Sequence, residues 1–258
     1  MRLPLHELRW LKRAALDSNR PLESLVQRRL NHEPLQYIIG TQPFGPLHNL
    51  RVRPPVLIPR PETEDWVIRL AEHLSSSSSG RPLSLLDLGT GSGCIPLLLC
   101  HLCPNIVATG IDISPHATRL ANENAEVCGI PHFRFKAFLG DFVHPGFPKA
   151  EAISPPYDVL TSNPPYITPD DYLRLSDDVA KFEDPTALIG GNDGLAFYRA
   201  IASLVARQGF LSPKATVALE VDHSQAEIVS DMLGPAGFKT SIWLDPWGKK
   251  RTVIAQRQ

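Results

Sequence analysis

The chain has 258 residues, of which 43% are hydrophobic, so it is long enough to bury the core of one large α/β domain with a small appendage. Its formal net charge of -1 disfavours a protein that wraps duplex nucleic acid, because such proteins are usually strongly basic. We therefore expect no direct contact with nucleic acid. No apolar run reaches the roughly 18 residues that a membrane span requires, so we expect no membrane segment.

Residues 1–36 are expected to form a short helical N-terminal domain. Leu22, Leu25 and Leu30 recur at helical spacing, and Pro21 suits the start of a helix. The segment before Pro21 carries more basic than acidic side chains, but it lacks the apolar stretch of a secretory signal. It therefore fits either an ordinary basic helix or a basic amphipathic targeting segment.

Residues 37–80 are expected to form a hairpin and a linker. Prolines and short apolar pairs over 37–62 indicate short strands and a loop, and a helix is expected over 62–74. The serine run and glycine at 75–80 are typical of a flexible surface loop. The charged side chains of 60–64 either order this linker over a ligand pocket or cap the helix with solvated charges.

Residues 81–258 show an alternation of strands and helices. We expect strands over 83–88, 106–111, 133–139, 158–161, 216–221, 238–244 and 251–256, and helices over 94–103, 114–128, 195–207 and 225–233. This alternation, with two strands closing the chain, predicts an α/β fold with a doubly wound, mostly parallel sheet.

A glycine-rich turn, Gly89-Thr90-Gly91-Ser92-Gly93, lies between the first of these strands and its helix. Glycines let the backbone turn sharply and let a ligand approach closely, and the start of a helix supplies free N–H groups. The turn is not followed by Lys-Ser/Thr and lacks the spacing of the dinucleotide fingerprint. We therefore predict a cofactor site here of neither the phosphate-loop type nor the dinucleotide type.

Two acidic residues follow later strands of the same region. Asp112 ends the strand after the turn, where a carboxylate can accept hydrogen bonds from both hydroxyls of a ribose. Asp141 follows the next strand, where it can accept from an adenine amino group, with Phe142 beside it for contact with the ring. Together with the glycine turn, these residues predict a site for an adenosine-bearing cofactor.

The tetrapeptide Asn163-Pro164-Pro165-Tyr166 directly follows the fourth strand. Ligands of open α/β sheets bind beyond the carboxyl ends of the strands, and the two prolines make this loop rigid. The side-chain oxygen of Asn163 and the carbonyl of Pro164 can both accept from one NH₂ group, and the ring of Tyr166 can stack on a flat substrate. We predict that Asn163, Pro164 and Tyr166 position an amide or amine nitrogen for methyl transfer, without a strong side-chain base.

These segments resemble the HemK/PrmC family of protein-(glutamine-N5) methyltransferases. The resemblance runs from about Glu33 to the C-terminus and rests on residues 57–64, 87–93, 163–166, 183–188 and 190–195. The Asn-Pro-Pro-Tyr motif alone is shared with DNA adenine and other amino-group methyltransferases. The Ile-Pro-Arg-Pro-Glu-Thr-Glu and Gly-Gly-x-Asp-Gly-Leu segments are more diagnostic of this family.

The resemblance implies a class I methyltransferase (Rossmann-like) fold whose seven-stranded, mostly parallel sheet has an antiparallel closing strand. It implies S-adenosyl-L-methionine as cofactor, bound by the glycine turn, Asp112, Phe142 and Asn163. The implied substrate is the glutamine of the Gly-Gly-Gln motif in class I peptide chain release factors, held by residues 163–166, and the modification supports translation termination. The short N-terminal domain departs from the family, which uses that region to hold the release factor.

Three other readings stay open at this level. An adenine-N6 or guanine-N2 nucleic-acid methyltransferase would use the same acceptors on a flipped base, although the chain shows only small basic clusters at 28–29 and 249–251. A nicotinamide-dependent oxidoreductase would explain the glycine turn but not residues 163–166. A non-enzymatic scaffold need not have kept Asn163.

The sequence also gives expectations for the cellular compartment and the oligomeric state. The serine-rich loop, the proline-rich insert at 145–156 and the basic start resemble a mitochondrial relative, whereas a bacterial form would be cytoplasmic. We expect a monomer whose partner is the release factor.

Overall fold

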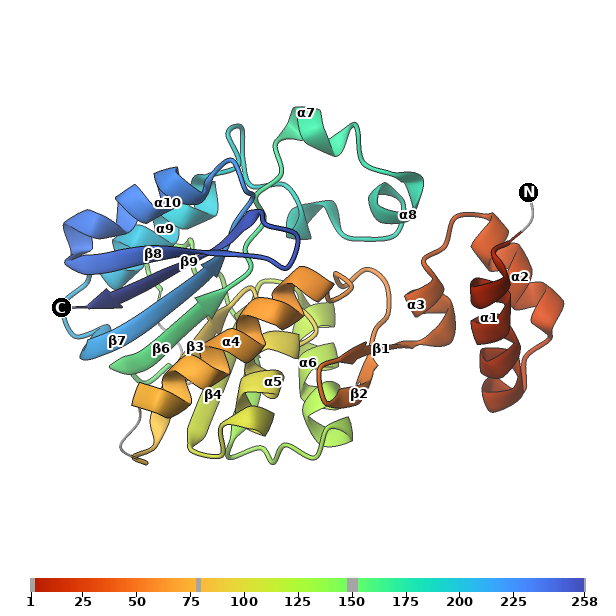
Figure 1. Cartoon of the computed structure of the whole chain (residues 1–258), viewed down its shortest axis with the longest axis horizontal. Coiled ribbons are helices and arrows are strands. Elements are labelled where there is room, and N and C mark those ends of the chain that lie inside the picture. Colours follow the sequence, from red (N-terminus) through yellow and green to blue (C-terminus); the bar gives the residue numbers. More distant parts are fainter. Residues whose placement is uncertain (1–2, 78–79, 148–152, 258) are drawn as a thin grey trace.

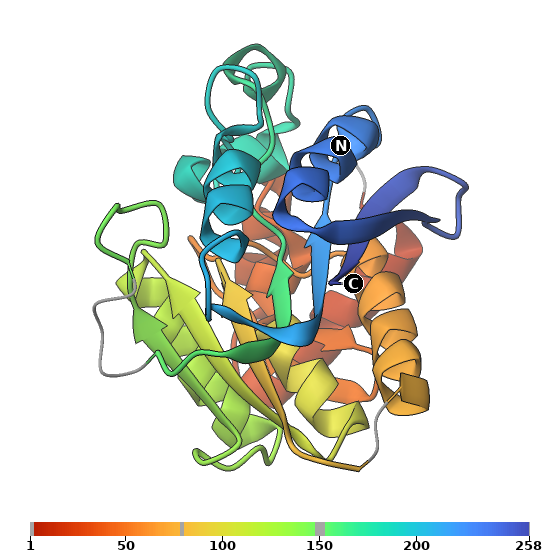
Figure 2. The same ribbon diagram turned by 90° about the vertical axis from the view of Figure 1, so that its left-hand side faces the viewer.

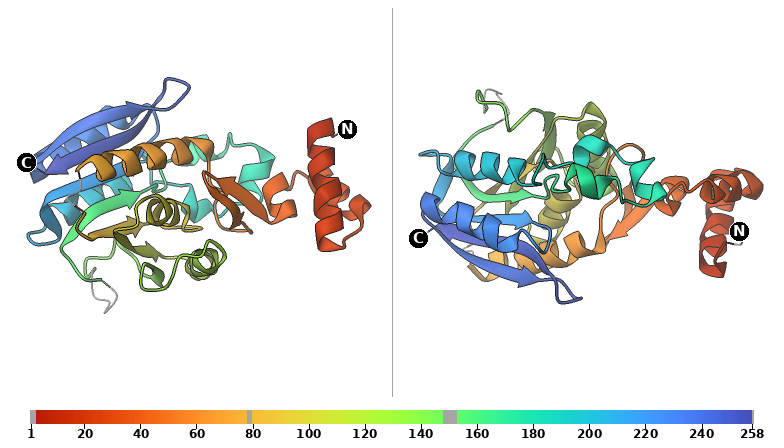
Figure 3. Two further views of the ribbon diagram at one scale, coloured as in Figure 1. Left: turned by 60° about the horizontal axis from the view of Figure 1, so that its bottom comes forward. Right: turned by 90° about the horizontal axis from the view of Figure 1, so that it is seen from above.

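The computed structural model describes residues 3–77, 80–147 and 153–257. At one end stand three helices, α1 (Leu5–Ser18), α2 (Leu22–Leu30) and α3 (Leu35–Ile39), each beginning directly after a proline. Figure 1 and Figure 3 show α1 and α2 set apart from the main body of the molecule. Leu11, Leu25 and Ile38 pack together as a small core, so the helical unit extends to Ile39. The expected boundary after residue 36 therefore falls inside α3.

A hairpin and a long helix connect this unit to the sheet. The strands β1 (Thr41–Phe44) and β2 (Leu47–Arg51) pair antiparallel, as the expected hairpin requires. The helix α4 (Pro61–Ser77) continues through the first serines of the serine run, which were expected to be a loop. Ser76 is accommodated because its hydroxyl donates to the carbonyl of His73 one turn earlier. The remaining serines, 78 and 79, lie outside the described residues.

The main sheet has seven strands in the order β5-β4-β3-β6-β7-β9-β8. Of these seven strands, β9 alone runs opposite to the others, which confirms the expected antiparallel closing strand. The strands are β3 (Leu83–Leu88), β4 (Ile106–Asp112), β5 (Phe135–Leu139), β6 (Tyr157–Ser162), β7 (Leu211–Glu220), β8 (Phe238–Leu244) and β9 (Lys250–Arg257).

Helices cover both faces of this sheet, as Figure 2 shows. One face carries α4, α5 (Cys94–Leu102) and α6 (Pro115–Val127), and the other carries α9 (Ala196–Val205) and α10 (Ala226–Leu233). In β3, Leu83 and Leu85 enter the first core, and Leu86 and Leu88 enter the second. Burial on both faces explains why the central parallel strands are almost continuously apolar.

Short elements fill the long connection between β6 and α9. They are α7 (Pro169–Tyr172), α8 (Asp177–Ala180) and the 3₁₀ turn η1 (Pro185–Ala187); a second 3₁₀ turn, η2 (Gly234–Ala236), precedes β8. The carboxyl ends of β3, β4, β6 and β7 point toward this connection and the N-terminal helices (Figure 1). The site described below lies at that edge.

Two strands begin more than one residue away from the expected position. β5 begins at Phe135 because Phe133 lies in a turn, closed by the Arg134 N–H donating to the Pro131 carbonyl. β7 begins at Leu211 and passes an irregular register before it pairs evenly with β6. Five residues of the proline-rich insert, 148–152, lie outside the described residues. No helix in the described ranges combines the length and the apolar character needed to cross a membrane.

Candidate active site

The glycine turn lies over the end of β3 and leads into α5. Gly89 and Gly91 line a cavity at the sheet edge, and Gly91 has a positive φ of 54° that other residues rarely adopt. The N–H of Gly91 donates to Asp112 Oδ2 over 2.8 Å. Thr90 and Ser92 are buried, so of the five predicted turn residues only Gly89 and Gly91 face the cavity.

Asp112 is fixed at the end of β4 and lines the same cavity. Its Oδ1 accepts from the Ser114 N–H at 2.9 Å, and its Oδ2 accepts from Gly91. Burial raises the pKa of Asp112 while these backbone donors oppose the rise. Each carboxylate oxygen keeps a second acceptor position, so the predicted hydrogen bonds to ribose hydroxyls fit this geometry.

The next residue, Ile113, was missed by the sequence argument. It is 64% exposed although it is large and apolar, and it lines the cavity beside Asp112. This isoleucine supplies an apolar surface beside the carboxylate that was predicted to bind a ribose. Its only sequence signal is its place directly after an acidic strand end.

Asp141 and Phe142 also line the cavity, as predicted. Asp141 Oδ1 accepts from the Val143 N–H at 2.9 Å, which orders the loop after β5. The ring of Phe142 lies with its centroid 5.8 Å from that of Phe197, so the two rings form one wall. Phe197 comes from α9, where it was not distinguishable from the apolar core face of that helix.

The tetrapeptide 163–166 divides between the cavity and the core. Asn163 and Pro165 line the cavity, whereas Pro164 is buried. The side chain of Tyr166 packs against the second core cluster, and burial raises its pKa well above the ordinary value. Its predicted stacking on a flat substrate therefore stays a prediction without a contact in this cavity.

The loop 163–166 is held from behind by the segment 190–195. A Cβ on Gly190 would lie 2.5 Å from the Pro165 carbonyl oxygen, so only glycine allows this approach. The Gln225 side chain adds a second support by donating to the Tyr166 carbonyl at 3.1 Å. These contacts give a physical reason for the glycines of the Gly-Gly-x-Asp-Gly-Leu segment.

The linker 53–64 closes over the cavity together with the segment 183–187. Arg60 donates to both carboxylate oxygens of Glu183, at 2.7 and 2.8 Å, and the side chain of Glu183 is only 1% exposed. The Asp184 N–H donates to the Pro55 carbonyl at 2.9 Å. This geometry favours the first of the two interpretations of 60–64, ordering of the linker over a pocket. The lining residues that these segments supply are Pro55, Val56, Leu57, Asp184, Thr186 and Ala187.

The cavity chemistry fits S-adenosylmethionine better than a dinucleotide. Among the described residues that line it, three are aspartates, Asp112, Asp141 and Asp184, and none is a lysine or arginine. A diphosphate would be repelled by these carboxylates, whereas a sulfonium and an ammonium group would be attracted. This disfavours the nicotinamide-dependent interpretation.

The small basic clusters do not form an open groove for nucleic acid. Arg28 pairs with Glu33, and Arg29 donates to Glu7 at 2.8 and 3.0 Å. In the other cluster, Lys250 pairs with Glu227. Paired cations contribute less to the counterion release that drives nucleic-acid binding.

Comparison with known protein families and structures identifies this arrangement. Residues 6–40 match the PrmC N-terminal domain, and residues 69–176 match the methyltransferase small domain. The catalytic domain of hMettl16, solved in complex with the MAT2A 3'UTR hairpin 6, matches with a TM-score of 0.65 and 15% identity, covering 88% of this chain and 83% of that one. At that identity the likeness shows the fold alone.

Closer relatives are release factor glutamine methyltransferases. That of Geobacter sulfurreducens is 38% identical over 89% of this chain and 75% of its own length, and that of Rhodospirillum rubrum is 36% identical over 92% and 69%. The N-terminal helices are included in the family match over residues 6–40, and the first part of the sheet domain in the match over residues 69–176. The chain is therefore a member of the release factor glutamine methyltransferase family, whose enzymes depend on S-adenosyl-L-methionine.

Proposed function

We propose that this chain methylates the side-chain amide nitrogen of the glutamine in the Gly-Gly-Gln motif of a class I peptide chain release factor, and so supports translation termination. One observation carries the proposal. Asn163 lines the cofactor cavity, and its side-chain NH₂ group is held by Thr63, so its oxygen is left to accept from a substrate. In the described part of the chain no donor reaches the Pro164 carbonyl either.

These two acceptors explain how an unreactive amide can be methylated. An amide nitrogen is a poor nucleophile because its lone pair is delocalised into the carbonyl group. When the Asn163 side-chain oxygen and the Pro164 carbonyl accept both N–H bonds, they hold the NH₂ group in place and favour pyramidal geometry at nitrogen. The loop can do this because its prolines and its support by Gly190 keep both oxygens fixed.

When bound, S-adenosylmethionine would supply a methyl group on a positively charged sulfur, which would leave as a neutral thioether while the amide nitrogen gained the methyl carbon and lost one proton to water. The residues Asp112, Ile113 and Phe142 would hold the adenosine part of the cofactor at the cavity. The three aspartates that line the cavity would favour binding of the cationic cofactor.

Mass spectrometry tests the proposal directly. The protein is incubated with S-adenosylmethionine and a class I release factor, and in parallel with duplex DNA and with RNA. We expect a mass gain of one CH₂ on the peptide that carries Gly-Gly-Gln and none on the nucleic acids. Methylation of a base with an unmodified release factor would select the nucleic-acid alternative.

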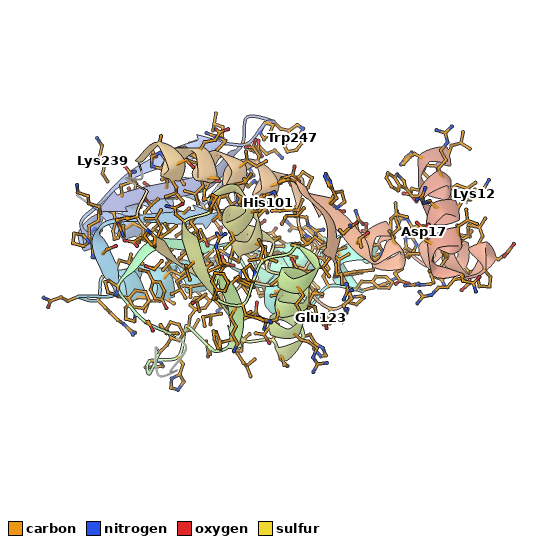
Figure 4. The ribbon with its side chains drawn as sticks, turned by 90° about the horizontal axis from the view of Figure 1, so that it is seen from below. Lys12, Asp17, His101, Glu123, Lys239 and Trp247 are labelled. Carbon is orange, nitrogen blue, oxygen red and sulfur yellow. The ribbon has the colours of Figure 1, made fainter. Side chains whose placement is uncertain are left out.

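We also propose a mitochondrial location and a monomeric state. The excess of basic side chains at the start of the chain supports the location, although Leu11 of the same segment packs in the helical core. Figure 4 shows Lys12 and Asp17 on α1, the helix set apart from the sheet domain. Cell fractionation and light scattering of the purified chain test these two points, with a cytoplasmic location as the alternative.

A further inference from the structure

A buried chain of hydrogen bonds connects the substrate loop to the start of α4 and the end of β7. The hydroxyl of Thr63 donates to Glu220 Oε2 at 2.6 Å, and Trp66 Nε1 donates to the same oxygen at 2.8 Å. Asn163 Nδ2 donates to Thr63 Oγ1 at 3.4 Å. Thr63 and Glu220 are each 2% exposed, and Trp66 is 1% exposed, so water competes little for these bonds.

The chemistry of these groups determines which atom donates and which accepts in each hydrogen bond. The indole N–H of Trp66 can only donate, so Glu220 Oε2 acts as an acceptor. Thr63 has one hydroxyl proton, which is directed to that carboxylate, so it offers only a lone pair to Asn163. The group of Asn163 that faces Thr63 must then be NH₂, because a flipped amide would place two oxygens against each other. The Asn163 oxygen consequently faces away from Thr63, toward the substrate.

The strand register keeps these groups together. Ser162 of β6 pairs with Leu219 of β7, so Asn163 and Glu220 follow neighbouring positions at the carboxyl edge of the sheet. The backbone carbonyl of Glu220 accepts from the Tyr198 hydroxyl at 2.8 Å, which anchors β7 to α9. Burial raises the pKa of Glu220, and the Thr63 and Trp66 donors and the nearby Arg251 oppose that rise.

We propose that Thr63, held by Glu220, is a positioning residue that sets the orientation of the Asn163 side-chain amide for methyl transfer. Thr63 acts through Asn163 and does not line the cavity. Its 3.4 Å contact with Asn163 is long, and such contacts commonly tighten when substrate binds. This inference rests on the proposed function for its kinetic consequence, but the hydrogen bond itself can be tested separately.

The kinetic test compares one substitution that removes the Thr63 hydroxyl with one that keeps it. Thr63→Val removes the hydroxyl and keeps the shape, so we expect kcat on release factor to fall roughly 10-fold, with cofactor binding within a few fold of wild type. Thr63→Ser keeps the hydroxyl and should restore most of the activity. The matched control is Thr216→Val, at a buried position on β7 away from the carboxyl edge, which should leave kcat unchanged. Equal loss in Thr63→Val and Thr63→Ser would overturn the proposal, because it would indicate a packing role.

A double-mutant cycle tests whether Thr63 acts through Asn163. In an Asn163→Ala background there is no amide to orient, so Thr63→Val should then have no further effect on kcat. If Thr63→Val lowered kcat by the same factor in both backgrounds, Thr63 would act independently of Asn163 and the proposal would be wrong.

A measurement without catalysis separates this inference from the proposed function. In nitrogen-15 NMR spectra of the full chain with S-adenosylmethionine, the hydrogen bond to Thr63 should shift one of the two Asn163 side-chain proton signals downfield and slow the exchange of that proton with water. Thr63→Ser should keep this pattern and Thr63→Val should lose it. If wild type fails to methylate release factor but shows this pattern, only the proposed function fails. If Thr63→Val leaves the signals unchanged, the hydrogen bond and the inference fail, whatever the activity.

Discussion

Asn163 supplies one of the two oxygens proposed to hold the NH₂ group of the substrate. Asn163→Ala removes one of the two proposed substrate acceptors but leaves Asp112 and the glycine turn in place. We expect kcat to fall on the order of 10²-fold or more, the usual scale for loss of a transition-state contact, with the cofactor dissociation constant within a few fold of wild type. Single-turnover kinetics and calorimetry measure the two quantities. Near-normal turnover would contradict the role of Asn163.

Some residues of the candidate site could be predicted from the sequence and others could not. The glycine turn, Asp112, Asp141 and Asn163 were predicted because each lies at or just after the end of a strand, where ligands of such sheets bind. Glu220 also ends a strand, but its hydrogen bonds to Thr63 and Trp66 join positions that are more than 150 residues apart. A local pattern cannot indicate a contact of that kind. Ile113 and Phe197 were missed because an apolar residue does not by itself reveal whether it faces a cavity or a core.

Secondary-structure elements differ in how well local sequence determines them. The limits of β3 and β8 were predicted correctly because Gly89 follows β3, and Gly237 and Asp245 flank β8. α7 and α8 were missed because four-residue helices are too short to show an apolar period. The start of β7 was missed because Pro213 interrupts the apolar pattern, at the point where the pairing with β6 is irregular.

The contacts between the loop 163–166 and the segment 190–195 predict that a side chain at Gly190 would lower activity. In Gly190→Ala, the new Cβ would meet the Pro165 carbonyl and the Tyr166 Cα at 2.5 and 2.7 Å, so the substrate loop must shift. We expect kcat to fall about 10-fold or more, because a small misplacement of positioning groups is costly, while cofactor binding changes little. Gly234→Ala, where a Cβ would meet nothing within 4 Å, is the control. Equal kinetics in the two variants would show that the loop tolerates the shift.

The hydrogen bonds that Asp158 of β6 accepts, one of them from Ser84 of β3, predict that the free energy of unfolding depends on pH. Burial disfavours charge on Asp158, but hydrogen bonds from Arg81, Ser212 and the Ser84 N–H lower its pKa to about 2. A carboxylate with a lowered native pKa stabilises the fold above its unfolded pKa, and that contribution is lost as the pH falls from about 4 to about 2. Asp158→Asn should therefore reduce the free energy of unfolding by about 1–2 kcal/mol at neutral pH.

Denaturant titrations at several pH values check the prediction for Asp158. The difference between wild type and Asp158→Asn should shrink as the pH approaches 2. Asp177→Asn, which removes an exposed pair with Lys181, is the control and should change stability little. A difference for Asp158→Asn that stayed constant down to pH 2 would show that the effect does not come from ionisation.

At the scale of the whole molecule, the N-terminal helices form a unit with its own core. Leu11 is fully buried in that core, away from the cofactor cavity. Leu11→Ala should destabilise α1 to α3 by about 2–4 kcal/mol, while the sheet domain keeps its cofactor affinity. If this unit holds the release factor, the KM for release factor should rise and kcat should stay close to wild type.

Hydrogen exchange over residues 5–39, together with steady-state kinetics, measures both effects of Leu11→Ala. The matched control is Leu16→Ala on the same helix, because Leu16 is 81% exposed. An unchanged KM with clearly loosened helices would exclude a role of this unit in substrate docking. The loop that carries exposed Trp247, between β8 and β9 (Figure 4), would then be the next surface to examine.

The most direct test of the central claim is a crystal structure of the chain with S-adenosylhomocysteine and a peptide that carries Gly-Gly-Gln. We expect the glutamine side-chain nitrogen to lie about 3 Å from both the Asn163 side-chain oxygen and the Pro164 carbonyl, facing the cofactor sulfur. A glutamine bound elsewhere, or an Asn163 amide that turns its nitrogen toward the peptide, would contradict the account.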